Sequence, residues 1–237
     1  MKLMTILYII LALVIFYYIY VGATRSSGIT SMTDAKVVQT IDPSKLTDNS
    51  GTNNYTYAVW MYVDNWNYRY GEPKVVFGRT DSSGTGEANP SPSVVLGAMQ
   101  NDLTILVTTY PNNNSGTPMV HNCVIKNIPL QKWTCLLISL YGRSLDVYLD
   151  GKLVRTCVLP GVAKINKRAP VKITPDGGFD GYTAKFMYFD QPTNPQEAWN
   201  IYKKGFMSGG ALGNFFEKYK IKVAFLEDNV EQGSLEI

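Results

Sequence analysis

The sequence is short of the side chains that most catalytic and metal sites need. Its 237 residues include one histidine and three cysteines. His121 alone would have to serve every serine or cysteine as a base, so nucleophilic catalysis is not expected. Cys123, Cys135 and Cys157 lie in separate strand-like runs without paired ligand spacing, which argues against zinc. An odd number of cysteines cannot pair completely within one chain, and we expect buried free thiols and a reducing environment.

Charge is also sparse. A net charge of +3 is too small to indicate a nucleic-acid partner. Basic residues crowd 152–172, where we expect a solvated loop, with contact to an anionic partner as the alternative. Glycoside hydrolysis needs two carboxylates on one face, but no run of alternating acids occurs. The nearest pair is Asp146 and Asp150, and Asp150 is needed in a turn, so we expect no enzymatic activity.

The longest apolar run is at the N-terminus. Residues 3–22 carry no charge, and a helix of this length reaches roughly 30 Å, the thickness of a bilayer core. The alternative is a secretory signal peptide, but the run exceeds the roughly 7 to 15 apolar residues usual there. Aromatic rings at its end, followed by Arg25, suit the headgroup level. We therefore expect an uncleaved single-pass membrane anchor at 1–23, with the lipid bilayer as a partner.

The rest of the chain divides by pattern. Residues 24–54 are polar and aperiodic, which predicts a spacer. From Tyr55 onward, short runs rich in Val, Ile, Thr and aromatics alternate with turn residues, which is typical of an all-β antiparallel sandwich or barrel. Asp150-Gly151 predicts a type I′ hairpin turn. The run 133–140 is apolar on both faces and should lie mid-sheet. The expected strands are 55–63, 74–79, 93–99, 103–109, 119–125, 133–140, 144–149, 152–159, 171–174 and 183–190.

One short helix is predicted over 195–204. Asn194 can cap it, Pro195 suits its first position, Glu197 completes a capping box, and Gly205 can end it. Three residues share a face that can cover an end of the sandwich: Ala198, Ile201 and Tyr202.

The ordered motifs YTYAVWMYV, KVVFGR, VVLGAMQNDLTILV, IPLQKWTCLLISLYGRSLDVYLDGKLVRT and FDGYTAKFMYFDQPTNPQEAWNIYKKG resemble the laminin G-like or concanavalin A-like jelly-roll domains. The resemblance covers 55–205 and is specific for fold rather than function. It implies an antiparallel β-sandwich with one short C-terminal helix. The aromatics in these motifs are interpreted as core residues: Trp60, Trp133, Tyr148 and Phe186.

Loop residues offer candidate sites for a glycan or protein partner and, separately, for calcium. The loop 65–70 has the aromatic and amide side chains that contact a glycan or a protein, and the two cannot be separated at this stage. Its candidate contact residues are Trp66, Tyr68, Arg69 and Tyr70, with Asn112 and Asn113 nearby. Calcium needs several oxygen ligands. Asp176 and Asp180 with the carbonyls of PDGGFDG, or Asp64, Asn65 and Asn67, offer some, but no motif fixes a metal site, and no cofactor is expected.

The segment 206–237 follows the last family motif. Ile221, Val223 and Phe225 alternate with other residues, so one strand face is apolar, and the end of the chain is acidic. We expect this docking tail to add a strand to the domain's own sheet, with a neighbouring protein as the alternative.

These features predict a membrane protein that binds and positions rather than catalyses. Its arrangement is similar to membrane-anchored minor capsid proteins of large double-stranded DNA viruses. That resemblance implies a structural or assembly protein that tethers a virion internal membrane to a protein layer, with capsid or coat proteins as partners. The alternative is a carbohydrate-binding, lectin-like module on a cell surface or secreted.

Overall fold

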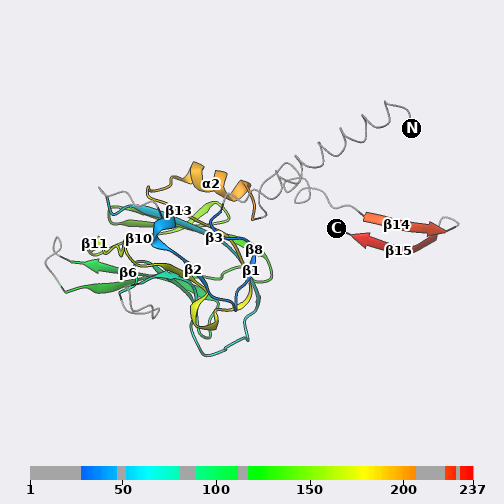
Figure 1. Cartoon of the computed structure of the whole chain (residues 1–237), viewed down its shortest axis with the longest axis horizontal. Coiled ribbons are helices and arrows are strands. Elements are labelled where there is room, and N and C mark those ends of the chain that lie inside the picture. Colours follow the sequence, from blue (N-terminus) through cyan, green and yellow to red (C-terminus); the bar gives the residue numbers. More distant parts are fainter. Residues whose placement is uncertain are drawn as a thin grey trace, which may run out of the picture. The chain divides into compact units, whose positions relative to one another are not determined.

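The computed structural model describes residues 28–46, 52–80, 89–111, 117–206, 222–227 and 230–236 (Figure 1). Two separate units contain them, a domain over 28–206 and a C-terminal hairpin. The apolar run 3–22 lies outside the described residues. Among the described residues, no helix is both long and apolar enough to span a bilayer.

The domain is a sandwich of two antiparallel sheets with helix α2 (Pro195–Lys203) on the first sheet (Figure 1). Two short 3-10 helices, η1 (Pro43–Lys45) and η2 (Pro175–Gly177), lie in its connections. The first sheet has the order β1 (Thr33–Asp34), β13 (Asp180–Phe189), β3 (Tyr55–Asn65), β8 (Trp133–Tyr141), β9 (Ser144–Leu149) and β10 (Lys152–Val158). The second has the order β11 (Val162–Ala163), β6 (Asp102–Tyr110), β5 (Ser93–Leu96), β4 (Lys74–Arg79), β12 (Val171–Ile173) and β2 (Gln39–Ile41), with β7 (Met119–Lys126) also paired to β6.

The predicted strands and turns from Tyr55 onward are confirmed. Each expected run contains a strand, with ends that differ by a few residues. Asp150 and Gly151 have φ of 50° and 74°, as a type I′ turn requires. Strand β8 lies between β3 and β9 in the middle of its sheet, because both of its faces must be covered.

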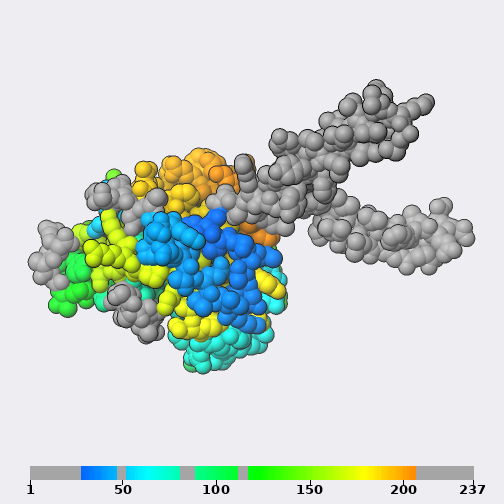
Figure 2. Space-filling view, viewed as in Figure 1, coloured from blue at the N-terminus to red at the C-terminus, as the bar shows by residue number. Residues whose placement is uncertain are grey.

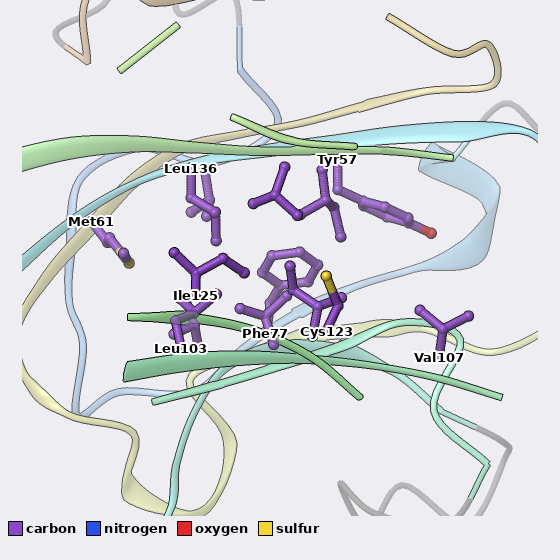
Figure 3. Close-up of a cluster of buried hydrophobic side chains, with 14 of the residues drawn as sticks. Tyr57, Met61, Phe77, Leu103, Val107, Cys123, Ile125 and Leu136 are labelled. Carbon is purple, nitrogen blue, oxygen red and sulfur yellow. The ribbon is translucent and has the colours of Figure 1, made fainter. Parts of the chain in front are cut away.

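The core lies between the sheets. Figure 3 shows Tyr57 and Leu136 of the first sheet facing Phe77 and Ile125 of the second. The Tyr57 ring centroid is 5.6 Å from that of Phe77 and 6.0 Å from that of Phe186, and the two phenylalanines are 5.3 Å apart. Aromatic pairs at these distances add to the hydrophobic gain from burying the rings.

The domain begins earlier than the sequence predicted. Within the expected spacer 24–54, strand β1 pairs with β13 and β2 pairs with β12. Ala35, Ile41 and Leu46 are buried in the core. Figure 2 shows 28–46, in blue, covering part of the domain. The segment looked like a spacer because strands of two and three residues bury too few side chains to give an alternating pattern.

The expectation of three free thiols is wrong for two of them. Cys123 of β7 and Cys157 of β10 form a disulfide with a Cα–Cα distance of 6.0 Å, and Cys135 is free and buried. The disulfide joins the first sheet to the second. Its partners are 34 residues apart, and only the stacking of the sheets brings them together.

The described strands of the C-terminal tail form a two-stranded sheet of their own. Strand β14 (Lys222–Glu227) pairs with β15 (Val230–Glu236), which corrects the expectation that it joins the domain's sheet. Val223 and Phe225 lie in β14, and Ile221 lies outside the described residues. A partner strand close in sequence needs a shorter loop to close than a distant sheet edge does, and so costs less entropy.

Candidate functional site

Helix α2 is fixed at both ends, as its sequence predicted. Asn194 Oδ1 accepts from the Glu197 amide at 2.9 Å, and Glu197 Oε2 accepts from the Asn194 amide at 3.1 Å, which completes the capping box. At the other end, the Lys185 ammonium donates to the Gly205 carbonyl at 2.7 Å. The helix covers an outer apolar patch of the first sheet, made by Ala58, Leu137, Tyr148 and Met187, which packs against Ala198 and Ile201.

Beside α2, the same outer face carries three aromatic side chains in one line. Tyr182 of β13 lies opposite Tyr62 of β3, and Tyr62 lies opposite Trp133 of β8. Directly paired residues share a face, so their side chains are neighbours. The ring centroids are 6.5 Å and 5.8 Å apart. Tyr182 is 45% exposed, and the other two are half-buried. We call these three residues the aromatic face.

The aromatic face continues into a row of contacting rings that runs from the first sheet onto α2, to which Tyr202 and Trp199 belong. Phe206 stacks on Trp133 at 4.2 Å and 14°, and lies 5.7 Å from Trp60. Trp60 then stacks on Tyr202 at 5.6 Å, and Tyr202 contacts Trp199 at 5.4 Å. Because Phe206 lies against Trp133, the tyrosines are the more open part of the aromatic face, and the packed rings hold it in place.

Acidic side chains border the aromatic face. Asp34 of β1 lies opposite Tyr182. Asp64 follows Tyr62 by two residues in β3, where the pairing of β3 with β13 shifts register. Both are exposed. Carboxylates in such positions can accept hydrogen bonds from a hydroxylated ligand stacked on the rings.

Trp66, a candidate contact residue of the loop 65–70, is half-buried. It packs against the main core, and the Lys74 ammonium lies 5.0 Å from its ring centroid. Lys74 is itself buried, and this desolvation lowers its pKa. The indole Nε1 is buried and has no hydrogen-bond partner among the described residues. Trp66 therefore serves the fold and offers little surface to a ligand.

The other residues of this loop bind the η2 loop. Tyr68 Oη donates to the Gly177 carbonyl at 3.1 Å, and the Arg69 guanidinium donates to the Asp176 carbonyl. Arg69 also pairs with Glu72 at 2.8 Å. Tyr70 is 60% exposed. Asn112 and Asn113 lie outside the described residues. The two loops suggested separately for glycan and calcium thus contact one another.

The acids of the suggested calcium loops do not converge on one point. The Lys36 ammonium is 2.6 Å from Asp180 Oδ1, and this hydrogen bond raises the pKa of Lys36. Across the described ranges, no three His, Cys, Asp or Glu side chains are grouped as a metal site requires.

The aromatics expected in the core divide between the two faces of the first sheet. Trp60, Tyr148 and Phe186 are buried as predicted, whereas Trp133 is half-buried on the outer face. Finding the aromatic face required the strand register. The sequence shows that aromatics occur in each strand but not which of them lie opposite one another.

Comparison with known families and structures agrees with this architecture. A laminin G model described as the concanavalin A-like lectin/glucanases superfamily matches residues 35–198. No curated protein matches the sequence. The botulinum neurotoxin serotype D ligand-binding domain in complex with N-acetylneuraminic acid is similar in structure, with a TM-score of 0.51 and 10% identity. The similarity covers 74% of this chain and 46% of that one.

The botulinum neurotoxin serotype D binding domain has a TM-score of 0.50 and 11% identity, over 76% of this chain and 41% of that one. The chain thus spans less than half of the length of these toxin structures, and such low identities show a shared fold alone. The family match extends over more than half of the sequence. The chain belongs to the concanavalin A-like lectin/glucanases superfamily.

Proposed function

We propose that this protein is a non-catalytic carbohydrate-binding module whose ligand stacks on the aromatic face. The observation that carries the proposal is the register of Tyr182, Tyr62 and Trp133 across three neighbouring strands. Binding sites for small ligands combine apolar and aromatic walls with a few polar groups that fix orientation. The tyrosine rings supply the first, and their hydroxyls with the carboxylate of Asp34 supply the second.

Binding is favoured over hydrolysis by the chemistry of these acids. Asp34 Oδ1 already accepts from the Lys36 amide at 2.8 Å, so this carboxylate has a structural role in its turn. Retaining and inverting glycosidases need a matched acid and nucleophile or base on either side of the scissile bond. The sequence shows no such matched pair of carboxylates at this face. The family description covers lectins and glucanases alike.

A second candidate function is tethering. The hairpin β14–β15 forms a unit apart from the domain and uses its own strands as partners. A tail of this kind suits docking to another protein, and residues 3–22 would hold the chain in a bilayer as a single-pass anchor. Capsid or coat proteins as partners, beneath a virion shell, rest on the resemblance described above. If removal of 207–237 leaves co-purification with a coat lattice intact, the tail is not the tether.

Glycan-array binding by the detergent-solubilised full chain tests the main proposal. We expect defined glycans to bind, and the double variant Tyr62→Ala/Tyr182→Ala to reduce binding at least about tenfold, since two stacking surfaces are lost. Tyr141→Ala is the matched control, because Tyr141 is 67% exposed and is not part of the aromatic face. The proposal fails if no glycan binds, or if the double variant binds as well as Tyr141→Ala while remaining folded.

A further inference from the structure

A separate groove lies along the other side of α2, next to the end of β13. Its volume is about 390 Å³, within the range of roughly 300–1,000 Å³ typical of small-molecule sites. None of its lining residues belongs to the aromatic face. The side chains that give it chemical character are Phe189, Asp190, Gln191, Glu197, Asn200 and Lys204.

The loop that forms one wall of this groove is fixed to the sheet. Thr56 Oγ1 donates to the Gln191 carbonyl at 2.7 Å. The Thr193 amide donates to Ser139 Oγ at 2.8 Å. The opposite wall is α2, whose first turn is fixed by its capping box. Both walls are therefore set before a ligand arrives, which lowers the entropic cost of binding.

The groove has an exposed ring at one end. Phe189 follows Met187 by two residues in β13 and so lies on the same outer face, where Met187 packs beneath α2. Phe189 is the last residue of the strand and is 39% exposed. Ile201 of α2 adds a second apolar surface to the lining. A ligand in the groove therefore meets an aromatic surface as well as polar groups.

The polar groups of the groove carry both signs of charge. Asp190 and Glu197 bring carboxylates, Lys204 brings an ammonium, and the amides of Gln191 and Asn200 can both donate and accept. An anionic ligand would meet the carboxylates and a cationic one would meet the lysine. A neutral ligand with several hydroxyls can donate to the acids and accept from the lysine and the amides.

We propose that this groove is a second binding site, which takes a neutral sugar residue with one ring face against Phe189 and its hydroxyls on Asp190 and Asn200. The ligand class rests on the proposed function, whereas the location is independent of the aromatic face. Glu197 Oε2 is already engaged by the Asn194 amide. Asn200 Oδ1 accepts from Gln196 Nε2 at 3.2 Å, so Asn200 offers its amide N–H groups to the sugar. Asp190 is therefore the carboxylate assigned to orient the sugar.

Saturation-transfer NMR on the full chain in detergent tests the groove, with neutral methyl glycosides as probes and N-acetylneuraminic acid and glucosamine as charged ones. We expect a neutral glycoside to bind, and Asp190→Asn and Phe189→Ala each to weaken it about tenfold. Lys204→Ala should weaken it as well. Lys203→Ala is the matched control, because Lys203 is adjacent to Lys204 in the chain but does not line the groove. Thermal unfolding confirms that each variant is folded.

The groove proposal is overturned if only a charged sugar binds, if no probe binds, or if Asp190→Asn binds as tightly as Lys203→Ala. The proposal for the aromatic face is tested separately, by whether Tyr62→Ala/Tyr182→Ala loses binding to extended glycans on the array. Monosaccharide binding lost in Asp190→Asn reports on the groove, whatever the array shows.

Discussion

The free thiol of Cys135 should be almost unreactive in the folded protein. Cys135 lies on the outer face of β8 and packs with Trp60 and Ala184. The rings of Trp133, Tyr202 and Phe206 pack against this cluster. It is 1% exposed, and burial raises its pKa from 9.0 to about 12, with a smaller contribution from the charge of Asp150. At pH 8 the thiolate fraction then falls from about one in ten to about one in ten thousand, so alkylation slows about a thousandfold.

Thiol counting on unreduced protein measures this. At pH 8 we expect no thiol to react at the rate of glutathione in the folded state, one to react in guanidinium chloride, and three after reduction. Because the pKa is raised, the folded-state rate should rise about tenfold per pH unit until about pH 12. If Cys135 reacts at the glutathione rate in the folded protein, its burial against Trp60 and Ala184 is refuted. Three thiols in unreduced, unfolded protein would refute the Cys123–Cys157 disulfide.

Three further changes test the fold through the free energy of unfolding. Asn194→Ala removes the side-chain cap of α2 and should cost about 1 kcal/mol in urea unfolding, with no change contradicting the capping role. Phe77→Ala leaves a cavity in the core and should cost about 3–5 kcal/mol, and a cost below 1 kcal/mol would show that the ring is not packed as described. Replacing Cys123 and Cys157 with serine should cost about 2–5 kcal/mol in calorimetric or urea unfolding. An unchanged stability would mean that the sheets are not cross-linked.

The central strands could be predicted from sequence because their own residues specify them. The run 133–140 is apolar on both faces, which only a mid-sheet position satisfies, and β8 has that position. Asp150-Gly151 adopts the positive φ values that its turn needs. Strands β1, β2 and β11 were missed, because two or three residues show no periodicity and their pairing depends on neighbouring strands.

The binding surfaces were harder to predict, because they depend on contacts between distant segments. The loop 65–70 has the composition of a contact surface, yet Tyr68 and Arg69 use their polar groups on the η2 loop of the same domain. Composition does not distinguish bonds within a chain from bonds to a ligand. The aromatic face has the opposite character, since Tyr62 and Trp133 looked like ordinary strand aromatics until their register was known.

The affinity of one array-selected glycan for two variants of Tyr62 tests the central claim most directly. Tyr62→Phe keeps the ring and Tyr62→Ala removes it, while both lose the hydroxyl. If the ligand stacks on the aromatic face, isothermal titration calorimetry should show Tyr62→Phe within a few-fold of the unaltered protein and Tyr62→Ala about tenfold weaker. Equal affinities for the two variants, with both folded, would contradict glycan binding at this face.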